Sequence, residues 1–185
     1  MAANLPTYAE QRIPVGGARV FIGAIGTTPS TDVGTIDIGG GVTITMSRTI
    51  GTVRAGFPSV PILNYASQED CMVEFSGMEI NPEQLRYGMG AGITTASASA
   101  ETYAFGGDPG VTTCAIHVRH EMVMGLTTNI YVWKARGVSD SVAVTFGESP
   151  STFPYKYLTM HSATDWAGNS LNGKAQLIQI QYQKA

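Results

Sequence analysis

The segment HVRHE, from His117 to Glu121, comes nearest in residue type and spacing to a metal site. On a helix, its two histidines could converge on one zinc ion. The surrounding sequence TTCAIHVRHEMVM alternates as a strand does, which places His117 and His120 on opposite faces. The pattern therefore predicts no metal site here, and His161 stands alone as a polar loop or edge residue.

The segment GESPS, at Gly147 to Ser151, is the nearest approach to a serine-nucleophile elbow. It lacks the second glycine of that motif, and Pro150 directly follows Ser149. The 14 acidic residues form no paired-carboxylate motif, although carboxylates that meet only in the fold would escape this search. We therefore expect neither an enzyme nor a cofactor, and a β-fold hydrolase ranks last among the alternatives.

The glycine run in DIGGGVTITMS, from Asp37 to Ser47, raises the question of a phosphate-binding loop. Such loops lead into a helix whose first amides face the anion. Here the glycines lead into alternating apolar and small polar residues, which is a strand pattern. The run is better explained as a tight turn or bulge between paired strands.

Composition favours one domain over residues 1–185 that associates with itself. Only 14% of the residues are charged, against about 25% in an average soluble domain. A surface so poor in charge usually contains an interface. The net charge of −3 and the absence of Lys and Arg clusters argue against a protein that binds nucleic acid through its phosphates. The start MAANLPTYAEQ shows no signal-peptide pattern, and no stretch is long and apolar enough for a membrane span.

Short alternating runs rich in Thr, Val and Ile, separated by many of the 22 glycines, predict an all-β fold. In a strand, Cys71 shares a face with Val73 and Phe75, and Cys114 with Ile116 and Val118, so both thiols are expected in the core rather than in a disulfide. The strands expected are Ala18 to Ile25, Gly34 to Ile38, Val42 to Ile50, Cys71 to Glu79, Thr112 to Met124, Asn129 to Arg136, Ser141 to Phe146 and Ala175 to Tyr182.

The segment NPEQLRYGMG predicts one short helix over residues 81–90. Asn81 suits the N-cap, Pro82 the first helical position, and Gln84 the position of a capping-box partner. Leu85 and Met89 share a face that would dock so short a helix on the rest of the domain.

Three segments fall outside this pattern of short strands. The first is an N-terminal arm over residues 1–17, and the second is RTIGTVRAGFPSVPILNY, residues 48–65, expected to be an extended loop. The third, ASASAETYAFGGDPG, residues 96–110, is expected to be a loop of small residues.

In the order and residue composition of its segments, the chain from about Gly26 onward resembles the tail tube proteins of long-tailed bacteriophages. The resemblance rests on GGGVTITMS, the extended RTIGTVRAGFPSVPI, the strand CMVEFSGMEI running into NPEQLRYGMG, and a final block from Asn129 to Asp165 followed by the strand AQLIQIQY. It implies a β-sandwich or barrel-like domain with one short flanking helix and a long inter-strand loop. It further implies hexameric rings stacked into a hollow tube through which DNA leaves the virion.

The resemblance implies several partners and a location. The partners are further copies of the same chain and other tail proteins: a tape measure, a terminator, and a baseplate or tip. DNA passes through without specific binding, because each phosphate held by Lys or Arg would resist sliding. The protein would be assembled in the host cytoplasm and would reside in the virion, in a contractile or a non-contractile tail.

Two sets of residues are candidates for tube function. Polar strand positions could face the lumen, although a solvated outer face explains them equally well. These positions are Asp37, Thr43, Thr45, Glu74 and Glu79. Apolar positions of residues 48–65 could contact an adjacent subunit or ring, and we prefer this to a loop packed on its own domain. These positions are Ile50, Val53, Phe57, Val60, Ile62 and Leu63.

A second class of function is a β-sandwich binding module or virion decoration protein that recognises carbohydrate. Aromatic side chains would then stack on sugar rings if they were exposed, although core or interface positions suit them better. The residues concerned are Trp133, Tyr155, Tyr157 and Trp166.

Overall fold

The structure, a computed structural model, describes residues 17–36, 41–106, 110–121, 126–143 and 152–183. It confirms the all-β class with one short helix. The elements are β1 (Ala18–Gly23), β2 (Thr31–Asp32), β3 (Val42–Ala55), β4 (Val60–Gly77), α1 (Pro82–Met89), β5 (Ile93–Ala96), β6 (Glu101–Ala104), β7 (Thr113–Glu121), β8 (Thr127–Gly137), β9 (Phe153–Thr159) and β10 (Gln179–Tyr182).

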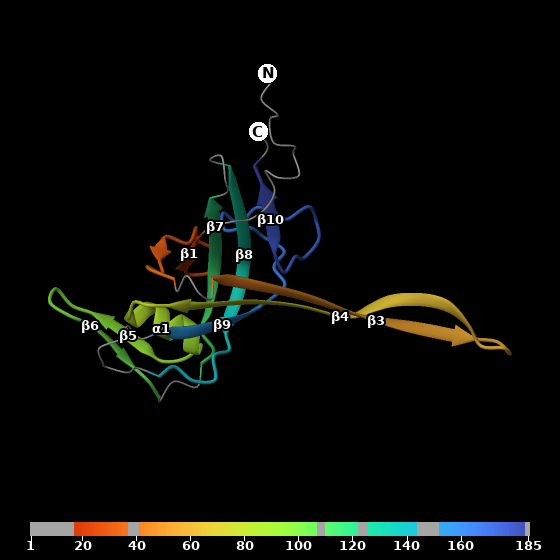
Figure 1. Cartoon of the computed structure of the whole chain (residues 1–185), viewed down its shortest axis with the longest axis horizontal. Coiled ribbons are helices and arrows are strands. Elements are labelled where there is room, and N and C mark those ends of the chain that lie inside the picture. The colour runs from red at the N-terminus through yellow and green to blue at the C-terminus, as the bar shows by residue number, and fades with distance from the viewer. Residues whose placement is uncertain (1–16, 37–40, 107–109, 122–125, 144–151, 184–185) are drawn as a thin grey trace, which may run out of the picture.

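Eight strands form one antiparallel sheet in the order β2-β1-β7-β8-β9-β4-β3, with β10 paired to β8. The sheet is folded over on itself. In Figure 1, β7, β8 and β10 stand upright, whereas β9, β4 and β3 run across them. The strands β5 and β6 form a separate hairpin beside α1.

Strand β8 connects the upright strands of the sheet with those that run across them. Strand β7 pairs with nearly the whole of β8, whereas on the other side β10 pairs with the first part of β8 and β9 with its last three residues. Between these parts the register with β7 shifts, because Cys114 lies opposite Ala135 while Ile116 lies opposite Val132. An irregularity of this kind bends a strand, and it lies where the sheet turns its corner.

The core fills the space enclosed by the folded sheet. Side chains from β1, β4, β7, β8, β9 and α1 all contribute to it, the largest being Phe75, Tyr87, Phe153, Tyr155 and Tyr157. Strand parity placed the cysteines correctly. Both are buried and free, and Cys114 packs with Ile116 and Val118 in this core.

The helix forms where the sequence predicts it. Asn81 Oδ1 accepts a hydrogen bond from the Glu83 amide at 2.9 Å, Pro82 opens the helix, and Gly90 ends it in the left-handed conformation at φ 65°. The capping-box expectation for Gln84 is wrong. Its side chain is buried and donates instead to the Asp32 carbonyl oxygen at 3.2 Å, which ties α1 to β2.

The expectation of an extended loop over residues 48–65 is wrong, because this segment is a β-hairpin. Strand β3 continues to Ala55, a turn occupies residues 56–59, and β4 returns from Val60. The glycines and prolines that suggested a loop lie in the turn or on an outer strand, where they are tolerated. The excursion out of the domain is real, but paired strands form it.

Several strand boundaries also differ from expectation. Residues 96–110 contain β6, which pairs with β5, rather than a loop alone. Strand β9 was not predicted, and Ser141 to Ala143, the described start of the expected strand Ser141 to Phe146, form no strand. In the part of the chain that the structure describes, no helix is long and apolar enough to cross a membrane.

Candidate functional site

The most distinctive surface is the outer half of the β3–β4 hairpin. We call residues 48–69 the hairpin arm. It extends away from the folded sheet in Figure 1, and every residue in it except Gly51 is exposed. At its base, Arg48 Nε lies 3.0 Å from Glu69 Oε1 across the two strands. Beyond this pair, the strands contact each other and nothing else in the described domain covers them.

All six residues expected at an interface lie on the hairpin arm and are exposed. Ile50 keeps 63% of its surface, Leu63 57%, and Phe57 at the tip is fully exposed. Tyr65, which was not among the residues expected at an interface, is also half exposed. Burying one side chain of this size stabilises by about 1.5–3 kcal/mol, so a solvated arm forgoes a large stabilisation.

An extra residue in β4 decides which face of the arm is apolar. Thr49 lies opposite Gln68, but the next residue, Ile50, lies opposite Ala66, so Ser67 is a bulge. A bulge reverses the alternation of its strand beyond that point. If β4 alternated strictly through Ser67, with that residue paired to β3, Tyr65 and Leu63 would lie on the core-facing side with Cys71.

Contacts along the arm confirm this assignment of faces. A Cβ atom on Gly51 would lie 2.6 Å from the Tyr65 ring, so this ring covers Gly51. On the opposite face, Thr52 Oγ1 donates to Asn64 Oδ1 at 2.8 Å. Leu63 lies opposite Val53 in register, on the same side as Tyr65. The face with Val53, Leu63 and Tyr65 is therefore an apolar strip, whereas Ile50, opposite Ala66, lies on the other face with Thr52.

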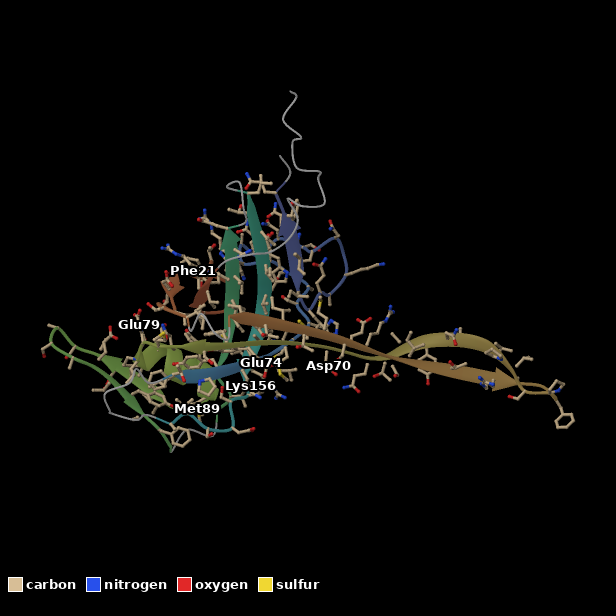
Figure 2. All side chains as sticks on the ribbon, viewed as in Figure 1. Phe21, Asp70, Glu74, Glu79, Met89 and Lys156 are labelled. Carbon is tan, nitrogen blue, oxygen red and sulfur yellow. The ribbon has the colours of Figure 1, made fainter. Side chains whose placement is uncertain are left out.

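Nearer the body, the same face is polar. It carries Thr43 and Thr45 of β3, and Glu74 of β4 lies opposite both Thr43 and Lys156 of β9. Lys156 Nζ lies 3.1 Å from Glu74 Oε1, and both side chains are partly exposed (Figure 2). We call the whole surface, from β9 to the tip of the arm, the outward face. It changes from polar to apolar as it leaves the body.

The polar part of the outward face carries charges of both signs. Asp70 and Glu74 of β4 lie on it with Lys156 of β9 and with Arg136, whose register partner is Leu158, and alternation adds Lys134. Three candidate lumen residues, Thr43, Thr45 and Glu74, therefore share one polar surface of mixed charge.

The other two candidate lumen residues do not join them. Glu79 lies beyond the end of β4, where Oε1 accepts hydrogen bonds from the Thr35 amide at 2.9 Å and the Thr35 hydroxyl at 3.0 Å. These bonds, the backbone one first, lower the pKa of Glu79. Asp37 lies outside the described residues, as do residues 1–16 of the expected N-terminal arm.

Strand β3 is an edge of the sheet over its whole length. Among the described strands it pairs only with β4, so the other side of its 14 residues offers unpaired amides and carbonyls. A long exposed edge is a template for a strand from another chain. The edge and the apolar strip lie on the same hairpin.

The histidines and cysteines do not form a reactive centre. His117 contacts Asn129 Oδ1 at 3.0 Å through Nε2 and stacks on Tyr131, whereas His120 contacts the Gly17 carbonyl from the other face of β7. No group of three or more potential metal ligands occurs among the described residues. Burial raises the pKa of Cys114 to about 12 and also raises that of Cys71, so both thiols stay protonated near neutral pH.

The four aromatic residues considered for sugar stacking are all buried. Tyr155 and Tyr157 lie in the main core, and Trp133 and Trp166 lie in a second small core, their rings edge to face at a centroid separation of 4.9 Å. A platform for sugar needs exposed ring faces. These four residues therefore stabilise the fold, in agreement with the core positions that the sequence favoured for them.

Comparison of the chain with protein-family models and with curated proteins finds no match.

Proposed function

We propose that this chain is a structural protein of a bacteriophage tail tube. Copies associate into rings, with six as the number that the family resemblance implies, and the rings stack into a hollow tube that conducts DNA. The observation that carries the proposal is the hairpin arm, whose apolar strip has no cover within the described parts of its own chain. Exposed apolar patches of this kind mark contacts with other chains.

The free edge of β3 supports ring formation. Pairing of this edge with a strand of a neighbouring copy would satisfy its free backbone groups and extend the sheet from one subunit to the next. Closing such a series into a ring removes every exposed edge, which is why cyclic assemblies of strands are stable. The low charge content of the chain fits a protein whose surface is largely covered by other copies.

The polar part of the outward face, which mixes charges of both signs, suits the wall of a channel for DNA. A cluster of Lys and Arg would bind phosphates and hold the duplex, whereas Lys156 here is compensated by Glu74. Thr43 and Thr45 add small polar groups without charge. The duplex could then slide past this wall without specific binding. Tail proteins that start, measure and end the tube would contact its terminal rings.

A point substitution on the arm tests the proposal. Leu63→Thr should abolish or strongly reduce the assembly of purified protein, seen by sedimentation velocity, because it removes apolar area at the centre of the strip. Ile180→Thr is the matched control, since Ile180 on β10 is equally exposed, at 51% against 57% for Leu63, but lies away from the arm. Unchanged assembly of the Leu63 variant, or equal loss in both variants, would contradict the proposal.

A further inference from the structure

The two ends of the molecule differ in charge. Between Thr49 and Gln68, Arg54 is the only charged residue of the hairpin arm, and no carboxylate of the described residues pairs with it. At about 3.3 Å per residue, the arm carries this guanidinium roughly 20 Å beyond its base at Arg48. A single unpaired cation thus lies near the tip, opposite Pro61 in register and on the face of the arm that alternates with the apolar strip.

The opposite end of the molecule has a complementary surface. Helix α1 and the β5–β6 hairpin flank a hollow of about 250 Å³ whose lining residues include Glu83 and Glu101. Within the described parts of the chain, neither carboxylate has a cation at ion-pair distance, and Glu83 accepts only long hydrogen bonds from Thr31 and Tyr87, at 3.5 and 3.4 Å. Ile93 and Phe105 expose apolar surface on the same hairpin segment.

Figure 1 shows that the arm and the β5–β6 hairpin extend to opposite ends of the long axis. The arm therefore cannot reach this hollow within its own copy. A contact between two different surfaces of identical chains propagates from copy to copy, as rings and stacks require. The two ends carry opposite charges, and both expose apolar surface. These two features favour a second copy as the occupant.

We propose that the hairpin arm of one copy docks against the α1–β5–β6 end of the next copy, with Arg54 between Glu83 and Glu101. The apolar strip, Leu63 and Tyr65 included, then covers Ile93 and Phe105. This inference rests on the proposed self-assembly and names its receiving surface. The apolar contact supplies most of the binding, and the charges fix which end is bound.

Carbodiimide cross-linking tests the contact directly. This reagent joins an amine to a carboxylate only when the two touch, so Arg54→Lys should be linked to Glu83 or Glu101 in assembled protein. Mixing heavy-isotope and normal copies shows by mass spectrometry that the link joins two different chains. The same variant carrying Glu83→Gln and Glu101→Gln is the control and should lose the link.

Charge exchange provides a second measurement. Arg54→Glu should raise the concentration needed for assembly about tenfold or more, which corresponds to 1.4 kcal/mol. Glu101→Arg should act likewise, and the two together should restore assembly to near the wild-type concentration. Assemblies that form without the link, or a double variant worse than either single one, would overturn the docking surface but leave the tube proposal intact. If the wild-type chain does not assemble, both proposals fail.

Discussion

The ammonium group of Lys156 lies 3.1 Å from the carboxylate of Glu74 on the neighbouring strand, directly beside Thr43 on the outward face (Figure 2). This pair consists of two charges that compensate each other on the polar part of that face. It is also partly exposed, with 49% of the Lys156 side chain and 33% of the Glu74 side chain accessible. We therefore expect the pair to affect the charge of this surface more than the stability of the fold.

Removing the Lys156 charge should leave the fold almost unchanged. Exposed ion pairs contribute about 1 kcal/mol or less, so Lys156→Ala should lower the free energy of unfolding by no more than that. Urea denaturation measures this change, with Lys174→Ala in an exposed loop as the control. A loss of several kcal/mol would show that the pair is structural and would weaken its assignment to a channel wall.

Deleting Ser67 should leave both folding and assembly nearly unchanged. Ser67 is the extra residue of the bulge, so its removal leaves Tyr65 opposite Gly51 and Leu63 opposite Val53, and the apolar strip keeps its face. The core makes no contact with this part of the arm, so the melting temperature should change little. Assembly, measured by sedimentation, should persist at close to the wild-type concentration.

The matched comparison is Leu63→Thr, which keeps the bulge but removes apolar area from the strip and should lose assembly. If the deletion variant loses assembly as Leu63→Thr does while its melting temperature stays the same, the assignment of faces from the register is wrong.

Gly88 allows α1 to approach β9 closely. A Cβ atom at this position would overlap Cδ1 of the buried Tyr155 ring. Gly88→Ala should therefore destabilise the fold by about 1–3 kcal/mol through overpacking. Gly17→Ala is the control, because nothing lies within 4 Å of its Cβ position. Equal unfolding midpoints in urea for the two variants would refute this account of helix docking.

The buried Cys114 thiol should make the fold sensitive to alkali. Burial raises its pKa from 9.0 to about 12, so the unfolded chain loses this proton at a lower pH than the folded one. This contribution is complete below pH 9 and is lost as the pH rises from 9 towards 12, by about 1.4 kcal/mol per pH unit. Unfolding free energies of the wild type and Cys114→Ala, measured at pH 8 and 10.5, test this. The two proteins should differ in pH dependence, and identical slopes would contradict the assignment.

Local signals were sufficient to predict the helix and the core-facing cysteines. The caps at Asn81 and Gly90 act through neighbouring backbone groups, and strand parity at Cys114 depends on residues two positions away. Strand β9 could also have been found, because Phe153, Tyr155 and Tyr157 alternate with outward residues.

The hairpin arm could not be predicted as strands from local signals. Its strands are held by cross-strand pairs such as Thr52 with Asn64, not by a buried face, so alternation is weak and Pro61 suggests a loop. The bulge at Ser67 depends on register and is invisible in one strand alone. Glu79 was misplaced because its bond to Thr35 joins residues far apart in the sequence.

The central claim is that the hairpin arm joins copies of this chain into a tube, and negative-stain microscopy of the purified protein tests it most directly. The wild-type chain should form rings or hollow filaments. A variant lacking Thr52 to Ser59, which removes the tip with Arg54 and Phe57, should remain folded and form no long tubes. Monodisperse wild-type monomers, or tubes of normal length after the deletion, would contradict the claim.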